Sequence, residues 1–415
     1  MKLWLDGAVG DPRLRVFGMS LIERHIRGVR HKASDRIPAI VDGGQAYFDA
    51  LPQDLRDSDV SLTHGTGSLA QRLAAALRQA GGPLLVAAGN VAIDQRLYGE
   101  LRKRSGNWLA TDENGAVALL RLEADAPLDA LGDVADWPGL IAALLYQPGI
   151  NRLRQEDFTA HIAVLRRDLP FWLRRVESEA ERATLERFMF KASYKGSTDF
   201  FTKYVYPPLV WAAVRPLARA RVHPNTVTIV SIVLTFAAVP FFAVGWWILG
   251  LLCAYGMSVL DSVDGKLARL TYSDSALGNV LDHGLDIVHP PLWYLGWALG
   301  LAGLGLWPPL DRALAEPAFQ AALVLVAFYV LDRLVLAIYK ARFGRGLHAH
   351  APIDALARTI ISRRNINLPL FTVGLVLGIG QQVFYFIVLW QVLTVLWHAG
   401  RTAWILLRGE KPAAA

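Results

Sequence analysis

The sequence predicts two structural classes in one chain: a soluble α/β domain followed by an all-α transmembrane domain of six helices. Of the 415 residues, 53% are hydrophobic and only 19% are charged. The apolar excess lies in the second half, in segments long enough to cross a bilayer. Residues 1 to about 190 instead alternate short apolar runs with helical patterns. The single cysteine excludes an intrachain disulfide and a CxxC metal site.

The first part of the chain carries the α/β pattern. Short apolar runs at 38–44 and 83–94 flank an amphipathic helical pattern at 68–80. Strands and helices that alternate in this way predict a layered domain with a largely parallel sheet. We assign residues 1–150 to this domain and 151–225 to a linker with juxtamembrane amphipathic helices. The N-terminus has no long apolar core and no cleavage site, so we expect the domain to stay in the cytosol.

The second part, residues 226–408, is predicted to form the membrane domain. We place its six spans at about 226–246, 248–270, 277–303, 317–341, 367–381 and 383–407. Lys and Arg gather after the second and fourth spans and in the tail, which puts both termini on the cytosolic side of an inner (plasma) membrane.

The segment just before the first span mixes aromatic and basic residues, as a helix lying in the interface does. A plain juxtamembrane linker is the alternative. The net charge of +7 lies beside apolar spans. This position favours membrane lipids as partners and argues against nucleic acid.

Four aspartates lie in the most apolar part of the chain. Asp261 and Asp264 are three residues apart, and Asp282 and Asp286 are four apart, so each pair shares one helix face. An ionised Asp at the bilayer centre costs about 2.5–3.5 kcal/mol. The cluster therefore needs water, protons or cations. Carboxylate oxygens suit hard divalent cations, and Mg²⁺ is usually shared between carboxylates and substrate phosphates.

Small residues and one arginine accompany the aspartates. Gly265 and Gly278 allow a ligand or a neighbouring helix to approach the backbone closely. Ala268 keeps the same face open, and Arg269 stands near the cytosolic end of its helix, where a guanidinium can contact phosphate. Any one of these residues is explained by packing or by an ordinary helix end. The whole set predicts a functional site.

The segment 261–286 reads D-x2-D-G-x2-A-R-x8-G-x3-D-x3-D, which resembles the signature of the CDP-alcohol phosphotransferase family. The stretch "HPNTVT" at 223–228 is similar to the family's usual Pro-Asn start of the first span, and the resemblance covers about 190 to 407. It implies six transmembrane helices and two divalent cations, Mg²⁺ or Mn²⁺. It also implies transfer of a substituted phosphate from CDP-diacylglycerol or a CDP-headgroup to an alcohol or polyol-phosphate, with release of CMP.

The resemblance also implies roles for single residues. Asp261, Asp264 and Asp282 would be metal ligands, and Asp286 would be the candidate base and a further ligand. The CDP pocket would be lined by Asp261, Gly265, Ala268, Arg269 and Gly278. A carboxylate between two cations is a weak base, whereas metal binding to the alcohol would acidify the hydroxyl. The sequence leaves open which of these effects dominates.

The acceptor site is the least determined part. The basic segment 340–364 either binds a phosphorylated acceptor or only reflects positive-inside topology. The candidate acceptor residues are Lys203, Arg221, Arg342, Arg363 and Arg364. His348 and His350 could bind a metal, although an HxH pair in a loop more often does not. Family members are frequently dimers, which makes a homodimer a further expectation.

The first domain carries a second resemblance. Segments 16–30 and 84–101 are similar to parts of sugar-phosphate nucleotidyltransferases, including inositol-phosphate cytidylyltransferase domains. The glycine-rich loop of that family is absent, because Gly7 and Gly10 are wrongly spaced. Asn90 stands where the metal-binding Asp is expected, and an amide is a poorer Mg²⁺ ligand. We therefore predict an inactive scaffold, regulator or dimerisation domain, with an unrelated α/β domain as the alternative.

Three functions remain in competition. The leading one is a membrane transferase that uses a CDP-activated donor. In a bifunctional enzyme, the first domain would make the CDP-alcohol that the second consumes, and CTP turnover would reveal it. In a divalent-cation transporter, the aspartates would form a permeation site, and CMP-insensitive cation flux would reveal it.

Overall fold

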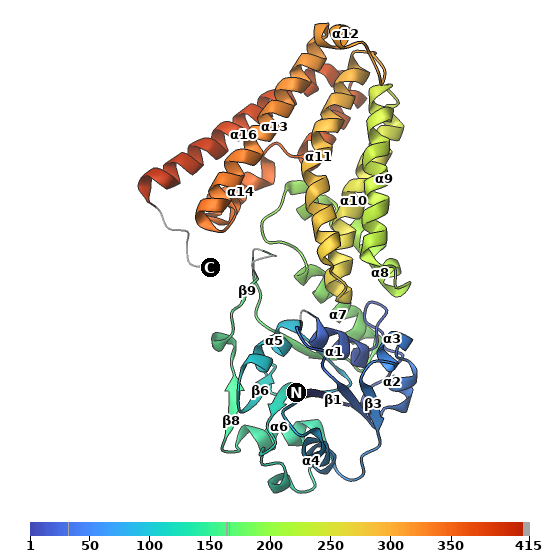
Figure 1. Cartoon of the computed structure of the whole chain (residues 1–415), viewed down its shortest axis with the longest axis vertical. Helices are drawn as coiled ribbons and strands as arrows, with labels where there is room; N and C mark the ends of the chain where they lie inside the picture. Colours follow the sequence, from blue (N-terminus) through green and yellow to red (C-terminus); the bar gives the residue numbers. More distant parts are fainter. Residues whose placement is uncertain (32, 163–164, 166, 410–415) are drawn as a thin grey trace.

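The structure is a computed structural model that describes residues 1–31, 33–162, 165 and 167–409. Within one helix it describes only the backbone of residues 276–277, 279–283 and 285–286. The chain forms an elongated molecule with two parts (Figure 1). An α/β part contains the N-terminus, and a helical bundle is stacked on it.

The α/β part is built on a seven-stranded sheet of order β3-β2-β1-β4-β7-β6-β8. Strands β1 to β4 pair in parallel, and so do β6 and β8, whereas β7 runs antiparallel to both its neighbours. The predicted α/β class with a parallel-rich sheet is confirmed. The strands are β1 (Lys2–Asp6), β2 (Ala39–Asp42), β3 (Val60–Thr63), β4 (Leu84–Ala88), β6 (Asn107–Thr111), β7 (Ala118–Leu122) and β8 (Ile150–Leu153).

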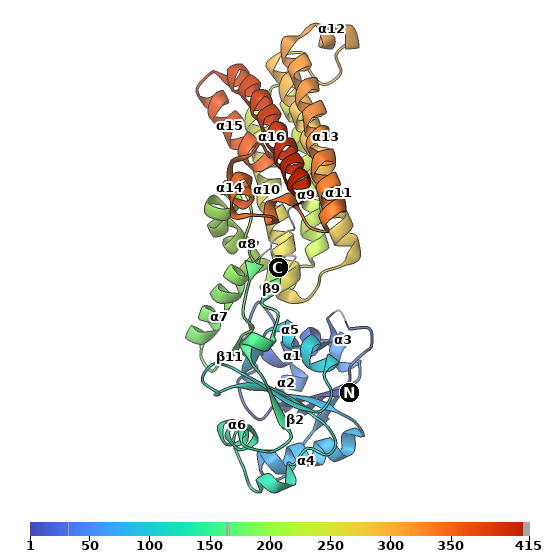
Figure 2. The same ribbon diagram turned by 90° about the vertical axis from the view of Figure 1, so that its left-hand side faces the viewer.

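Helices cover both faces of this sheet, as Figures 1 and 2 show. On the side of the bundle lie α1 (Leu21–Arg30) and α5 (Gln95–Lys103), and on the far side lie α4 (Leu69–Ala80) and α6 (Trp137–Leu145). Short helices α2 (Gln45–Asp49) and α3 (Gln53–Arg56) connect β2 to β3. Helix α4 begins with a capping box between Ser68 and Gln71 and ends at Gly81 in the left-handed conformation.

The segment that connects the seven-stranded sheet to the bundle adds one strand to the α/β part. Strand β11 (Leu173–Arg175) pairs antiparallel with β5 (Val91–Ile93), and β9 (His161–Ile162) pairs with β10 (Arg167–Asp168). Then follow α7 (Glu179–Ala192), which starts with a Ser178–Glu181 capping box, a π-helical turn (Phe201–Val205) and α8 (Pro207–Arg219). Single turns of 3-10 helix lie at Asp129–Leu131, Gln155–Asp157 and Leu347–Ala349.

The bundle is all-α, as predicted. Its helices are α9 (Pro224–Ala243), α10 (Trp247–Thr271), α11 (Ala276–Leu301), α12 (Leu310–Ala315), α13 (Pro317–Phe343), α14 (Pro352–Ile360), α15 (Arg364–Val376) and α16 (Gly380–Arg408). Helix α9 packs against α10 and α11, and α13 packs against α16. Aromatic side chains fill the interior, where Trp297 stacks on Phe371 with ring centroids 4.2 Å apart.

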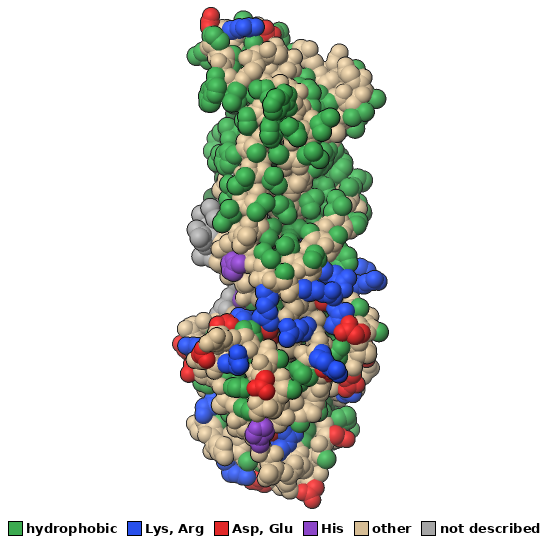
Figure 3. All heavy atoms as spheres, turned by 90° about the vertical axis from the view of Figure 1, so that its right-hand side faces the viewer, with side chains coloured by type: hydrophobic (Ala, Val, Ile, Leu, Met, Phe, Trp, Pro, Cys, Tyr) green, Lys and Arg blue, Asp and Glu red, His purple; other side chains and the backbone are tan. Residues whose placement is uncertain are grey.

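The described part of the bundle gives four candidate spans rather than six: α9, α10, α13 and α16. The segment expected at 367–381 is α15, which has 13 residues. At 1.5 Å per residue it is about 20 Å long, short of a hydrocarbon core of about 30 Å. The segment expected at 277–303 is α11, some of whose side chains lie outside the described residues. Figure 3 shows apolar side chains over the bundle and a band of Lys and Arg at its junction with the α/β part.

A buried histidine makes the α/β part sensitive to acid. His25 on α1 is 2% exposed, and its Nδ1 is 2.5 Å from the Tyr98 hydroxyl on α5. Burial lowers the pKa of His25 from 6.5 to about 4. Between pH 6.5 and pH 4 the imidazole is protonated in the unfolded chain but neutral in the folded domain. The contribution of His25 to the free energy of unfolding is therefore greatest above pH 6.5 and decreases as the pH falls toward 4.

We expect the α/β part to lose about 2 kcal/mol of stability between pH 7 and pH 5 through this residue. Hydrogen exchange of the β4 amides in the full chain, corrected for intrinsic exchange rates, measures the change. His25→Gln should remove this contribution, because glutamine does not titrate. An equal loss in His25→Gln and in the wild type would contradict the assignment.

Candidate functional site

The first half of the aspartate motif lies on α10, about ten residues before the end that meets the α/β part. Asp264 is buried, and its Oδ2 accepts a hydrogen bond from the Thr228 hydroxyl of α9 at 2.7 Å. Its Oδ1 is 2.5 Å from the amide nitrogen of Gly265. Hydrogen bonds to both oxygens fix the orientation of this carboxylate.

Asp261 faces a cation from another helix. Its Oδ2 is 2.8 Å from Nη2 of Arg364, at the start of α15. Nη1 of the same guanidinium lies 3.1 Å from Nε2 of His289 on α11. Arg364 therefore joins three helices and places positive charge beside a carboxylate 103 residues away in the sequence. The structure thus brings together a predicted metal ligand and a predicted acceptor residue.

The second half of the motif lies on α11. The backbone places Asp282 and Asp286 on this helix, but their side chains lie outside the described residues, so their predicted roles stay predictions. Gly278 lies in the first turn of α11, where Ser275 caps the helix. A Cβ at Gly278 would meet Asn225 Oδ1 at 2.8 Å. A larger residue at Gly278 would therefore displace the Asn225 side chain between α11 and α9.

The side chains expected around a nucleotide also share one region of α10. The guanidinium of Arg269 lies against Gly265, whose added Cβ would be 3.4 Å from Nη1. Ala268 is half-buried one turn before the end of the helix. A face with a glycine, an alanine and an arginine leaves room beside a positive charge, as a phosphate-bearing ligand requires.

Three of the other predicted acceptor residues have described partners away from Asp261 and Asp264. Arg221 pairs with Glu23 of α1 at 2.6 Å, and this carboxylate raises the pKa of the Arg221 guanidinium. The Lys203 ammonium lies 5.2 Å from the Tyr204 ring centre, and Arg342 lies 5.7 Å from that of Phe343. Arg363 directly precedes Arg364 as the N-cap residue of α15.

His348 and His350 have separate partners within the protein. His350 Nδ1 is 2.6 Å from the Tyr339 hydroxyl, and His348 Nδ1 is 3.2 Å from the Asp354 carbonyl oxygen. Among the residues whose side chains the structure describes, no group of three or more His, Cys, Asp or Glu could hold a metal ion. The donor chemistry of Asp261 and Asp264 does fit a hard cation, because both present charged oxygens and Asp261 already faces a positive group.

The α/β part holds the turn between the two halves of the motif. Arg24 of α1 donates to the Leu270 carbonyl oxygen at 2.9 Å and to the Tyr272 hydroxyl at 3.1 Å. Tyr272 ends α10 in the left-handed conformation, with φ at +55°. His31 pairs with Asp274 in the same turn. The segment that connects the two helices of the motif is therefore anchored to the soluble domain.

Sequence reasoning missed Thr228, Asn225, Arg24 and Tyr272 as neighbours of the motif. The first two belong to the stretch "HPNTVT", whose short polar side chains at the start of an apolar span were a usable signal. The contacts of Arg24 join residues 246 and 248 positions apart, and no local pattern announces them.

The fold and this site define an integral membrane protein with a polar site near the end of its bundle that meets the soluble domain. Residues 221–397 match the family model described as CDP-alcohol phosphatidyltransferase. The chain therefore contains a domain of this family, as the motif predicted. The match begins at residue 221, so the nucleotidyltransferase resemblance of the first domain stays a prediction.

Curated relatives agree with this family. The chain is 34% identical to the inner membrane protein YnjF of Escherichia coli over 26% of this chain and 48% of the relative. It is 29% identical to human cholinephosphotransferase 1, over 34% of this chain and 36% of that relative. It is 27% identical to the bifunctional IPC transferase and DIPP synthase of Thermococcus kodakarensis, over 31% of this chain and 33% of that relative. The chain spans less than half the length of each of these relatives.

Solved structures include phosphatidylinositol phosphate synthase of Mycobacterium tuberculosis with CDP-DAG bound. It is 17% identical, the match covers 48% of this chain and 93% of that one, and the TM-score is 0.36. The apo form of the same enzyme gives 19% identity, 48% and 95% coverage, and a TM-score of 0.34.

Thr228 provides a test of the proposed metal site that does not depend on turnover. Thr228→Val removes the hydroxyl that orients Asp264 while nearly keeping the side-chain volume. Loss of such an outer partner typically weakens metal binding about 10- to 100-fold. We expect this loss in Mn²⁺ titrations of the full chain followed by electron paramagnetic resonance.

Thr226→Val is the matched control, because Thr226 lies exposed on the same helix. It should leave the Mn²⁺ affinity unchanged. Equal affinities in the wild type and both variants would show that Thr228 does not support a metal ligand.

Proposed function

We propose that this protein transfers a substituted phosphate from a CDP-linked donor to an alcohol and releases CMP, in phospholipid or polyol-phosphodiester synthesis. The observation that carries the proposal is the complete eight-position motif between Asp261 and Asp286, inside a domain that matches the CDP-alcohol phosphatidyltransferase model. Two of the relatives bear the names of transferases, cholinephosphotransferase and IPC transferase. The band of basic side chains at one end of an apolar bundle supports a cytosolic site in a multi-pass protein.

In the proposed site, the four aspartates of the motif would hold two divalent cations, Mg²⁺ or Mn²⁺, and these would neutralise the pyrophosphate of the donor. Thr228 holds Asp264 in one orientation. Asp286 accepts the proton of the acceptor hydroxyl. The hydroxyl oxygen then forms a bond to the phosphorus that carries the donor's substituent. The bond from this phosphorus to the bridging oxygen breaks, and CMP leaves with the electron pair.

Arg269 and the small residues Gly265, Ala268 and Gly278 are assigned to the cytidine diphosphate. Arg364 is assigned to a phosphate of the acceptor or donor, since its fork already approaches Asp261 from α15. This assignment makes Arg364 a link between metal ligand and substrate. Arg363 remains an acceptor candidate beside it.

We further propose that the first domain does not bind a catalytic nucleotide. Ligands of open α/β sheets bind at the carboxyl ends of parallel strands. There, Arg72 pairs with Asp6 of β1 at 3.1 Å and also with Asp42 of β2, while Trp137 donates to Asp6 at 2.8 Å. Both carboxylates are buried and already compensated by this arginine. The side-chain amide of Asn90 is also engaged, because its Nδ2 donates a hydrogen bond to Glu177 Oε1 at 2.8 Å.

CMP release by the purified full chain in lipid, with Mg²⁺ or Mn²⁺, tests the proposed transfer. CDP-diacylglycerol is offered with a panel of polyol phosphates, and CDP-headgroups are offered with diacylglycerol. We expect CMP only with one donor–acceptor pair. Asp286→Asn should lower the rate on the order of 10²- to 10⁴-fold, because it removes the proton acceptor. Asp282→Asn should weaken Mn²⁺ binding as well as turnover.

Asp311→Asn is the control, because Asp311 lies exposed at the opposite end of the bundle. CMP release that survives Asp282→Asn and Asp286→Asn would refute the proposed site. CMP-insensitive cation flux in proteoliposomes, without CMP release from any pair, would favour the transport function. CTP turnover by the full chain would contradict the inactive first domain and favour the bifunctional enzyme.

A further inference from the structure

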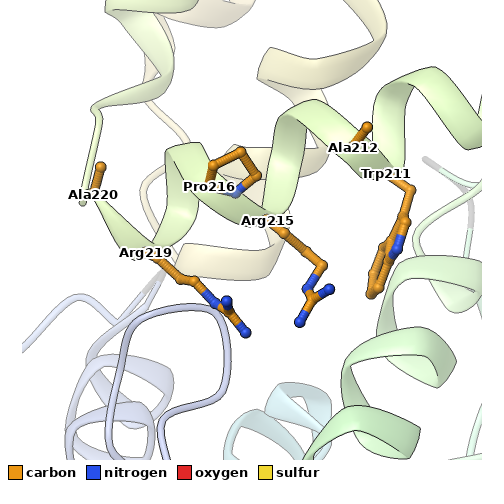
Figure 4. A pocket seen from close by; sticks show the side chains of 6 residues that line it. All are labelled: Trp211, Ala212, Arg215, Pro216, Arg219 and Ala220. Carbon is orange, nitrogen blue, oxygen red and sulfur yellow. The ribbon is translucent and has the colours of Figure 1, made fainter.

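A basic cavity lies beside α8, away from the aspartates. It measures about 560 Å³ and is lined by Trp211, Ala212, Arg215, Pro216, Arg219 and Ala220. Trp211, Arg215 and Arg219 follow one another at intervals of four residues and therefore share a helix face. Figure 4 shows both guanidinium groups extending from the same side of α8 into this space, with the Trp211 ring beside Arg215.

The cavity holds more positive charge than its surroundings neutralise. The buried Glu186 of α7 places Oε2 3.3 Å from Arg215 Nε and 3.9 Å from Arg219 Nη2. The same oxygen lies 2.9 Å from Arg182 Nη1, and Oε1 accepts the amide hydrogen of Phe17 at 2.9 Å. Glu179 pairs with Arg182 at 2.7 Å. Arg215 and Arg219 therefore share a single carboxylate that a third arginine also uses.

The two arginines leave their hydrogen-bond donors unused, and of these Arg215 Nε is buried facing Glu186. Within the described part of the chain, neither guanidinium donates a hydrogen bond, and their side chains are 33% and 49% exposed. A guanidinium carries five N–H groups in a planar fork that matches the oxygens of a phosphate. Two adjacent forks with one shared counter-charge favour a ligand with several anionic oxygens.

The position of α8 favours a membrane lipid as the source of this phosphate. The helix ends a few residues before α9, the first candidate span, and lies between the bundle and the α/β part (Figure 2). Another face of α8 exposes Leu209, Ala212 and Pro216. An exposed apolar face beside Trp and Arg is typical of a helix in the bilayer interface, at the level of the headgroups. Basic residues at this level attract anionic lipids.

We propose that the α8 cavity binds the headgroup phosphate of an anionic phospholipid. The forks of Arg215 and Arg219 hold the phosphate oxygens, Trp211 packs on the headgroup, and the acyl chains run along the exposed apolar face of α8. The cavity shares no residue with the proposed transfer site, so the bound lipid is a resident of the interface and not the substrate of that site. It ties the linker between the two domains to the membrane surface.

Native mass spectrometry of the full chain tests this proposal. The protein is released from nanodiscs of equimolar phosphatidylglycerol and phosphatidylcholine, and the retained lipids are counted. The wild type should retain phosphatidylglycerol in preference to phosphatidylcholine. Arg215→Gln with Arg219→Gln should weaken phosphatidylglycerol binding about 10- to 100-fold, because two charge-assisted contacts are lost.

Lys340→Gln with Arg408→Gln is the matched control, because these exposed residues end α13 and α16 at the same end of the bundle. It removes the same charge and should leave phosphatidylglycerol retention within about twofold of the wild type. Arg219→Gln alone is the milder variant and should keep the fold, since this half-exposed side chain approaches Glu186 only to 3.9 Å. It should still weaken retention at least severalfold.

Several results would overturn the proposal. One is equal retention of the two lipids by the wild type. Another is equal loss of phosphatidylglycerol in the α8 double variant and in the control, which would indicate general attraction to the surface. A third is binding of inorganic phosphate or glycerol 3-phosphate in detergent that depends on Arg219 while phosphatidylglycerol is not retained. That result would make the cavity a site for a soluble phosphate.

Discussion

The contact between Asp261 and Arg364 satisfies the constraint on which the rest of the bundle depends. A carboxylate in an apolar bundle is costly unless a positive group or a set of hydrogen-bond donors faces it. Arg364 meets this need from α15, and Thr228 meets it for Asp264 from α9. Because the partners come from different helices, the acidic motif fixes how α9, α10 and α15 pack. The same charges that could bind cations and phosphates thus organise the helices around them.

The soluble domain extends this organisation to the turn between α10 and α11. Arg24 of α1 and His31, which follows it, form hydrogen bonds and an ion pair with residues 270–274. Glu23 pairs with Arg221 just before α9. Such contacts between charged and polar groups tolerate little displacement, because their buried partners would be left unsatisfied. Through these contacts the α/β part influences the geometry of the turn between α10 and α11.

The basic residues of the junction serve different purposes although they look alike in sequence. Arg221 neutralises a buried glutamate, Arg24 anchors a turn, and Arg364 neutralises the motif. Arg215 and Arg219 instead keep hydrogen-bond donors unused in an open cavity at the level of the interface. The partners around each guanidinium therefore differ in ways that position in a basic segment does not reveal.

The sequence by itself determined the two-part architecture, the α/β class and the motif, because hydrophobic periodicity, turn chemistry and residue spacing are local properties. It also predicted that Gly265 and Arg269 share a helix face, because helix spacing determines which residues lie side by side, and the Arg269 guanidinium does lie against Gly265. The antiparallel β7, the short α15 and the pairing of Asp261 with Arg364 were decided only by the tertiary structure. Each depends on which distant segments meet, and the free energy of those contacts belongs to the packed chain and to no local pattern.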